Sequence, residues 1–178
     1  MLSLIGRGGF ARVYAARRSA GGDEVAVKVG DAAATERFER EAFALGRLPP
    51  GVAPRLLEKG QTRLGEPFLA LELLRGESLA ELLALLPGAG ALAPAETLKF
   101  FDDICEPVAR MHEAGIIHRD LKPENVFLRR EGGVALLDLG LARFTDESGP
   151  VFTETLTRPA QRLGTAHYMA PEQCLEAR

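Results

Sequence analysis

Cysteine and tryptophan are scarce in this chain of 178 residues, which contains two cysteines and no tryptophan. Cys105 and Cys174 lie far apart in the sequence, and neither belongs to a pair with the spacing of metal ligands. A fold held together by disulfides is therefore excluded. The cysteine usage instead favours a reducing, cytoplasmic setting.

Long hydrophobic runs are also missing. The longest stretch without a charged residue is 82–95, and prolines and glycines interrupt it. A helix that spans a bilayer needs about 20 apolar residues. The first residues, Met1–Ile5, lack the charged region and the full apolar core of a signal peptide. We therefore expect no membrane segment within this chain.

An excess of positive charge is absent too, because 22 Lys and Arg face 25 Asp and Glu, giving a net charge of −3. No general positive field would attract nucleic acid, so no nucleic-acid partner is expected. Hydrophobic residues make up 46% and charged residues 26% of the chain, which is ordinary for a soluble protein with a sizeable core. Lysine is rare, with only four against 18 arginines.

The pattern of apolar residues predicts an α+β fold whose first part is rich in strands and whose second part is rich in helices. Helices are expected at about 32–48, from Ser78 to Pro87, and over 94–113, where prolines and glycines mark several ends. A boundary is expected near 74–77. The strands are expected at 2–5, 11–16, 24–29, 55–58, 68–73, 126–128 and 134–137, with mostly loop from Asp138 onward.

A glycine-rich segment, Gly6-Arg7-Gly8-Gly9-Phe10-Ala11-Arg12-Val13, joins the first two expected strands. Glycines let a backbone approach phosphate oxygens and present N–H groups to them. A strand follows rather than a helix, which argues against a dinucleotide-binding fold. The alternative is a plain hairpin turn without a ligand.

Lys28 and Glu41 are charged residues at positions where apolar ones are expected. Lys28 lies on the strand Val25–Val29, either as an edge residue whose ammonium reaches water or as a phosphate ligand below the glycine-rich segment. Glu41 shares a helical face with Phe38 and Leu45. A carboxylate buried there needs a partner, and Lys28 is the natural one. The alternative is a partly exposed helix edge.

Two polar segments of the second part contain residues suited to phosphate chemistry. One is His118-Arg119-Asp120-Leu121-Lys122-Pro123-Glu124-Asn125, and the other is Asp138-Leu139-Gly140 at the end of an apolar strand. Asn125 and Asp138 offer the oxygen ligands that Mg²⁺ prefers. The alternatives are a solvated loop and a turn cap.

Taken in order, these segments resemble those of the protein kinase family, specifically the bacterial serine/threonine kinases of eukaryotic type. The resemblance rests on the glycine-rich segment, Val25-Ala26-Val27-Lys28, the loop 118–125, Asp138-Leu139-Gly140 and Ala170-Pro171-Glu172. It implies a two-lobe fold, with an ATP-binding N-lobe at 1–74 and a partial C-lobe at 75–178. Ala11 and Leu139 depart from the family's commoner glycine and phenylalanine.

The resemblance also implies a role for each matching residue. Asp120 would accept the proton of the substrate hydroxyl, Lys122 would neutralise the transferring phosphoryl group, and Lys28 would hold ATP phosphates while paired to Glu41. Asn125 and Asp138 would bind Mg²⁺. The expected ATP pocket consists of Gly6, Gly8, Gly9, Val13, Ala26, Lys28, Leu71, Glu72, Leu74 and Phe127.

The same resemblance implies protein substrates with Ser or Thr acceptors. Thr165 would lie in the substrate loop, and Arg119 would bind a phosphothreonine formed by autophosphorylation, which self-association would permit. Thr153, Thr155 and Thr157 are the expected phosphorylation sites, although threonine is also common in exposed loops. A small-molecule phosphotransferase is a weaker alternative, because Ala170-Pro171-Glu172 favours protein substrates.

Complete kinase domains continue well beyond the point where this chain stops, six residues after Glu172. We therefore expect a truncated domain. The alternative function is a catalytically inactive nucleotide-binding or interaction fragment of a kinase. Truncation would leave an apolar face of the helix 94–113 uncovered, formed by Leu98, Phe101, Ile104, Cys105, Val108 and Met111.

Overall fold

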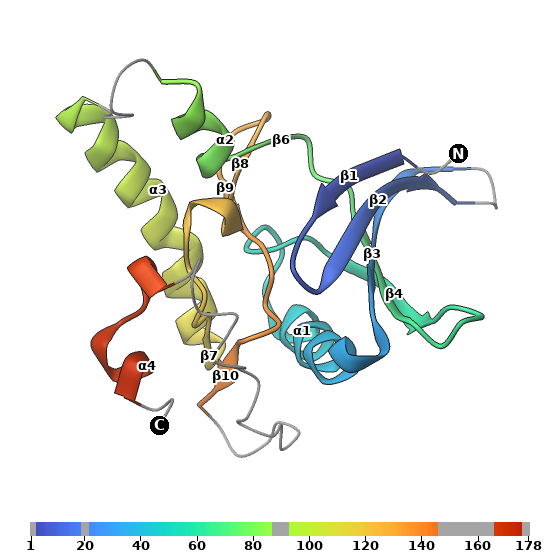
Figure 1. The fold of residues 1–178 in the computed structure, drawn as a ribbon. Helices are drawn as coiled ribbons and strands as arrows, with labels where there is room; N and C mark the ends of the chain where they lie inside the picture. Colours follow the sequence, from blue (N-terminus) through green and yellow to red (C-terminus); the bar gives the residue numbers. More distant parts are fainter. Residues whose placement is uncertain (1–2, 19–21, 87–92, 146–165, 176–178) are drawn as a thin grey trace.

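The computed structural model of the chain describes residues 3–18, 22–86, 93–145 and 166–175. A strand-rich part and a helix-rich part lie side by side, with the long helix α3 on the side away from the main sheet (Figure 1). No helix in these ranges is both long and apolar enough to cross a bilayer. Thr153, Thr155, Thr157 and Thr165 lie outside the described residues.

A five-stranded sheet forms the first part, with the order β1-β2-β3-β5-β4 and antiparallel pairing between all neighbours. The glycine-rich segment is the turn between β1 and β2, closed by a 2.9 Å bond from the Gly8 N–H to the Ala11 carbonyl. The strands predicted from the sequence are present. Their bounds are β1 (Ser3–Arg7), β2 (Ala11–Arg17), β3 (Glu24–Gly30), β4 (Leu56–Gln61) and β5 (Pro67–Glu72).

Helix α1 (Thr35–Arg47) packs on β4 and β5 and follows a short 3₁₀ turn, Ala32–Ala34. The single predicted helix therefore divides in two. Phe38, Glu41 and Ala42 are buried on its inner face. Phe38 and Ala42 belong to the core of the sheet, as expected for an amphipathic helix whose apolar stripe faces inward.

The second part contains the helices α2 (Leu79–Ala84), α3 (Pro94–Glu113) and α4 (Pro171–Leu175). Ser78 caps α2, because its hydroxyl accepts a 3.1 Å bond from the Glu81 N–H while the Glu81 carboxylate accepts one from the Ser78 N–H. Two small sheets complete this part. One consists of β6 (Gly76–Ser78), β8 (Val126–Arg129) and β9 (Val134–Leu136), and the other of β7 (Ile116–Ile117) and β10 (Arg143–Phe144).

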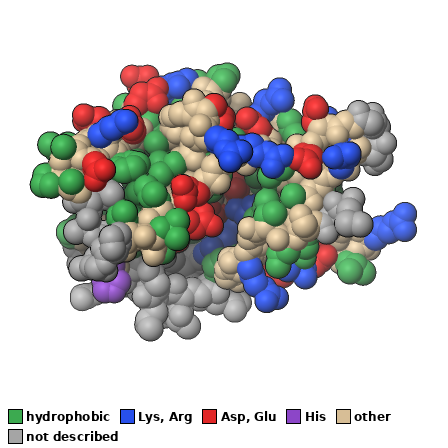
Figure 2. Space-filling view, turned by 90° about the horizontal axis from the view of Figure 1, so that it is seen from above, with side chains coloured by type: hydrophobic (Ala, Val, Ile, Leu, Met, Phe, Trp, Pro, Cys, Tyr) green, Lys and Arg blue, Asp and Glu red, His purple; other side chains and the backbone are tan. Residues whose placement is uncertain are grey.

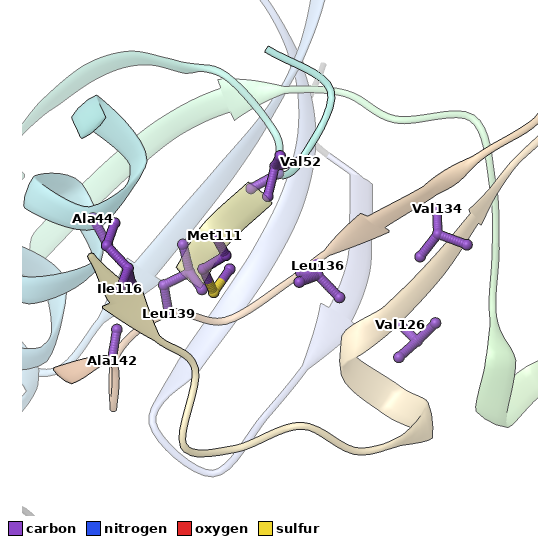
Figure 3. Packing of buried hydrophobic residues seen from close by; sticks show 10 residues of the cluster. Ala44, Val52, Met111, Ile116, Val126, Val134, Leu136, Leu139 and Ala142 are labelled. Carbon is purple, nitrogen blue, oxygen red and sulfur yellow. The ribbon is translucent and has the colours of Figure 1, made fainter. Parts of the chain in front are cut away.

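One hydrophobic core joins the two parts. It includes Ala44 of α1 and Val52 of the following loop together with Met111, Ile116 and Leu136 of the second part (Figure 3). Polar bonds reinforce the junction, since the Leu136 N–H donates to the Val52 carbonyl at 2.8 Å. The loop after α1 is thereby fixed to the second part.

The second part differs from the expectations in two respects. The segment after Asp138 is expected to be mostly loop, and within its described residues the short elements β10 and α4 form. Strand β6 was not anticipated, because its three residues begin with a glycine and carry no alternating pattern. On α3, Met111 is buried in the core and Ile104 and Val108 pack against it. The expected exposed face is confirmed only for Leu98, Phe101 and Cys105.

Candidate active site

A cleft of about 360 Å³ lies between the two parts, below the glycine-rich turn. Figure 2 shows the surface hollowed near its centre, with acidic and basic side chains at the hollow. The cleft is lined by every residue predicted for ATP binding and by both predicted metal ligands. These are Gly6, Gly8, Gly9, Val13, Ala26, Lys28, Leu71, Glu72, Leu74, Phe127, Asn125 and Asp138.

Lys28 is the central cation of this cleft. Its Nζ lies 2.6 Å from Glu41 Oε2 and 3.0 Å from Asp138 Oδ1, so α1 and the Asp-Leu-Gly segment meet at one ammonium. The side chains of Lys28 and Glu41 are only 12% and 5% exposed. The predicted pairing of Lys28 with Glu41 is therefore present, and Glu41 is buried rather than at a helix edge.

Electrostatics favour the charged forms of Lys28 and Asp138, whereas burial raises the pKa of Glu41 and the Lys28 charge only partly opposes this. Burial alone would lower the pKa of Lys28, but the carboxylates of Glu41 and Asp138 outweigh it and the pKa is raised. The Lys28 charge in turn lowers the pKa of Asp138 to about 2. Asp138 is thus ionised at neutral pH. Its carboxylate remains 52% exposed, facing the cleft.

Asp120 is the centre of a second polar cluster, on the loop after β7. Its Oδ2 accepts a 2.8 Å bond from Lys122 Nζ and a 3.1 Å bond from Asn125 Nδ2. Asn125 Nδ2 also donates to the Asp120 carbonyl at 2.7 Å. The carboxylate is buried, and among the described residues its Oδ1 has no hydrogen-bond partner. A buried acceptor without a partner is costly, which marks the Asp120 carboxylate as a candidate functional group.

His118 connects the two clusters. Its Nε2 bonds the Leu137 carbonyl at 3.0 Å, and its Nδ1 accepts from the Asp120 N–H at 3.3 Å. The ring is therefore the neutral tautomer with the proton on Nε2. Burial lowers the pKa of His118, which favours this neutral form. The ring fixes the spacing between the loop of Asp120 and the strand end before Asp138.

Two non-glycine residues of the site adopt left-handed backbone conformations. Arg119 has φ 64° and Asp138 has φ 59°. This conformation is unfavourable for residues with a Cβ atom and is concentrated at functional sites. At both positions the chain turns sharply, directly before Asp120 and after Leu137.

The apolar end of the cleft suits a flat aromatic ring. Val13 and Ala26, on neighbouring strands, line it from the sheet, and Phe127 lines it from the second part. Leu71 stands at the end of β5. The Glu72 N–H is already used in a 2.9 Å bond to the Arg55 carbonyl. Glu72 and Leu74 also border the cleft.

The oxygen donors of the cleft fit a Mg²⁺ ion held jointly with phosphates. Asn125 uses its Nδ2 for Asp120, which leaves Oδ1 as the atom that could bind a metal ion, and Asp138 offers an ionised carboxylate. In the part of the chain that the structure describes, no group of three or more His, Cys, Asp or Glu could hold a metal alone. Mg²⁺ typically takes one or two carboxylates and completes its shell with phosphate oxygens and water.

Arg119 lies beside Asp120 and is tied to α4, because Gln173 Nε2 donates a 2.8 Å bond to the Arg119 carbonyl. Arg40 of α1 lies near it. Burial lowers the pKa of the Arg40 guanidinium, and the nearby Glu36 carboxylate partly opposes this effect. The positive charges of Arg119 and Arg37 lower the pKa of Arg40 further. The Arg40 guanidinium is buried and donates to the Ala142 carbonyl at 3.2 Å.

Sequence reasoning missed two arginines of α1. Arg37 lines the cleft, and its guanidinium carbon lies 3.8 Å from the ring centre of Phe10 at the turn between β1 and β2. Arg40 contributes to the positive region near Arg119. Both precede Glu41 within one helical turn, and that spacing is the signal that could have pointed to them.

Comparison with known proteins agrees with these observations. A model of the protein kinase domain matches residues 1–177. Relatives include a probable serine/threonine-protein kinase PknB of Corynebacterium glutamicum, 34% identical over 96% of this chain and 27% of its own length. A DNA damage-responsive serine/threonine-protein kinase, RqkA of Deinococcus radiodurans, is 40% identical over 97% of this chain and 26% of its own.

A probable serine/threonine-protein kinase of Streptomyces coelicolor is 36% identical to this chain, which covers 26% of that relative's length. The chain thus spans about a quarter of the length of each of these relatives. The family match, by contrast, covers nearly the whole chain. The chain belongs to the protein kinase domain family, among relatives that are bacterial serine/threonine-protein kinases.

Proposed function

We propose that this chain binds Mg²⁺-ATP in its cleft and transfers the γ-phosphoryl group to Ser or Thr hydroxyls of proteins. The observation that carries the proposal is the Asp120 carboxylate, whose Oδ2 is bound by Lys122 and Asn125 while its buried Oδ1 has no partner among the described residues. A carboxylate with a fixed orientation and an unpaired oxygen is suited to take the proton of a substrate hydroxyl. We further propose that residues 1–74 serve as the ATP-binding lobe and 75–178 as a partial catalytic lobe.

In this reaction Asp120 orients the acceptor hydroxyl and takes its proton. The acceptor oxygen forms a bond to the γ-phosphorus as the bond from that phosphorus to the bridging oxygen of ADP breaks. The released electron pair leaves with ADP. Lys122 and Lys28 face the negative charge that spreads over the phosphate oxygens. Catalysis of this kind depends mainly on positioning and charge, which suits a site of fixed cations.

Asn125 and Asp138 would hold the metal in the proposed site. When bound, Mg²⁺ would neutralise negative charge on the phosphate groups of ATP. Lys28 contributes by keeping Asp138 ionised and in place at 3.0 Å. In this proposal the glycine-rich turn would cover the phosphates, and Val13, Ala26, Leu71 and Phe127, which line the cleft, would enclose the adenine.

We also propose regulation through Arg119. A phosphothreonine carries about two negative charges and pairs well with arginine. Arg119 and Arg40 offer positive charge on the side of the site next to α4. Thr153, Thr155 and Thr157 are the proposed sites of this phosphorylation, which two copies of the chain would carry out on each other in the cytoplasm with ATP as the phosphoryl donor. An active preparation that gains no phosphate in the peptide 152–158 after incubation with ATP would refute this.

The central proposal is tested with radiolabelled ATP, Mg²⁺ and a basic acceptor protein. We expect transfer to Ser or Thr by the wild-type chain and loss of at least about 100-fold in Asp120→Asn, since general-base steps contribute on this order. Asp120→Asn should still be stabilised thermally by Mg²⁺-ATP. Equal labelling by wild type and Asp120→Asn would contradict the assignment.

One observation favours a second candidate, nucleotide binding without transfer. Leu98 and Phe101 on α3 are 67% and 66% exposed, so part of this helix has no apolar cover among the described residues. Stabilisation of the wild-type chain by Mg²⁺-ATP without any transfer would favour that candidate. The assay therefore separates the two functions.

A further inference from the structure

Arg37 joins three parts of the proposed site that are distant in the sequence. Its guanidinium carbon lies 3.8 Å from the centre of the Phe10 ring. Its Cβ lies close to Gly140 of the Asp-Leu-Gly segment, since a Cβ atom added to Gly140 would lie 3.5 Å from it. It also lines the cleft together with Phe10 and Asp138. One side chain of α1 thus contacts the tip of the glycine-rich turn and the segment of the proposed metal ligand.

The geometry points to Arg37 as a positioning residue that holds the glycine-rich turn closed over the phosphates of bound ATP. This inference rests on the proposed function. An arginine over an aromatic ring gives an attraction that is stronger where water is partly excluded. Gly8 and Gly9 of the turn are exposed, and the bond from the Gly8 N–H to the Ala11 carbonyl closes it. Because glycine allows many backbone conformations, the contact of Phe10 with α1 restricts the conformations open to the turn.

The position of Arg37 also couples the turn to Lys28. Arg37 and Glu41 are four residues apart, so they lie on the same face of α1, one turn from each other. Glu41 binds Lys28 at 2.6 Å while Arg37 binds Phe10. With α1 in this position, Lys28 and the glycine-rich turn are both located where they would contact the phosphates of bound ATP. Arg37 is partly buried, which lowers the pKa of its guanidinium, and the charges of Asp138 and Asp120 partly oppose this.

The first measurement needs no nucleotide. The chain has no tryptophan, so Phe10→Trp introduces a single indole at the tip of the turn. In this background Arg37→Met removes the guanidinium and keeps an unbranched stem next to Gly140. We expect acrylamide to quench the indole about twofold more efficiently after Arg37→Met, because the indole loses its cover. Unchanged quenching would overturn the inference.

Arg47→Ala is the matched control. Arg47 lies on the same helix and its guanidinium lies 5.5 Å from the ring centre of Phe43, but it does not line the cleft. Its loss should leave the quenching of the indole unchanged. An equal rise in quenching in Arg47→Ala and in Arg37→Met would show a general loosening of α1 and would overturn the inference.

The second measurement concerns ligand affinity in the otherwise wild-type chain, followed by thermal shift. Arg37→Met and Phe10→Leu should each weaken Mg²⁺-ATP binding by about three- to tenfold, the range expected for loss of one such contact. The double variant should be no weaker than the weaker single one, because both remove the same contact. Adenosine, which has no phosphates, should bind all four proteins alike. Additive losses, or equal losses for adenosine, would overturn the inference.

Absence of Mg²⁺-ATP binding by the wild-type chain would be a different result. It would overturn the proposed function and with it the role of Arg37 toward phosphates. Quenching that still depends on Arg37 would then support only the contact between the helix and the turn. The two failures are therefore distinguishable.

Discussion

Lys28 and Lys59 form ion pairs of the same length in very different surroundings. Each Nζ lies 2.6 Å from a glutamate of α1, Glu41 and Glu39 respectively. The Lys28 pair is almost fully buried, whereas the Lys59 and Glu39 side chains are 52% and 54% exposed. Removing one partner of a buried pair leaves an uncompensated charge, whereas an exposed pair is screened by water.

We expect Lys28→Met to lower the free energy of unfolding by about 3 kcal/mol and to abolish phosphotransfer. Lys59→Met, the matched control, should change the free energy of unfolding by less than about 1 kcal/mol. Adding Glu41→Gln to Lys28→Met should recover stability without recovering transfer, since it removes the buried charge. Urea unfolding of the four proteins measures these values, and equal effects of the two lysine substitutions would contradict this account.

His118 should make stability depend on pH. Burial holds its folded-state pKa below the ordinary value, although Asp138 and Asp120 partly oppose this. The unfolded chain therefore binds a proton first as the pH falls through about 6.5, and stability is lost in that range. Because other groups titrate as well, the measurement is a comparison of the melting temperature of wild type and His118→Gln from about pH 7.5 to 5.5. The wild type should fall more steeply, and parallel curves would exclude this role.

Among the elements, β6 depends on one glycine. Gly76 has φ +147°, and a Cβ added there would lie 1.9 Å from the Leu128 carbonyl oxygen of the neighbouring strand β8. Gly65 also has a positive φ, +77°, but it has open space around it. Both positions have a positive φ that favours glycine. Only at Gly76 would a side chain also collide with a neighbouring strand.

Gly76→Ala should therefore cost at least about 3 kcal/mol of unfolding free energy, the sum of backbone strain and overpacking. Gly65→Ala should cost only the backbone strain of about 1–2 kcal/mol. Chemical denaturation of both variants tests the difference. If the two alanine variants are equally stable, β6 does not require close contact with β8.

The elements also show where sequence reasoning succeeds and where it ends. Alternating valines predict β3 and a short apolar run predicts β5, while the helical face that Glu41 shares with apolar residues points to Lys28 as its partner. Strand β6 escaped because its pairing with β8 joins residues about fifty positions apart without a local pattern. Arg37 escaped for a similar reason. On an amphipathic helix it is one more polar residue, and only the placement of the glycine-rich turn in space brings Phe10 to it.

At the scale of the whole molecule, the proposed division at residues 74 and 75 crosses a shared core. Ala44 and Val52 of the first part are fully buried against Met111, Ile116 and Leu136 of the second. Arg110 and Arg129 add bonds of 2.9 Å and 3.4 Å to the carbonyls of Pro50 and Gly51. A continuous core makes the stability of each part depend on the other.

The two parts should consequently unfold in one transition. Met111→Ala removes a fully buried side chain from the shared core and should cost about 2–5 kcal/mol. Because Met111 contributes to a core that both parts use, the whole transition should move to lower temperature without splitting. Calorimetry gives the test, since a calorimetric enthalpy equal to the van't Hoff enthalpy marks a single transition. Two resolved transitions, of which Met111→Ala shifts only the one that belongs to the second part, would contradict this prediction. Each part would then fold independently, and the shared core would not fix the positions of the two parts on either side of the cleft.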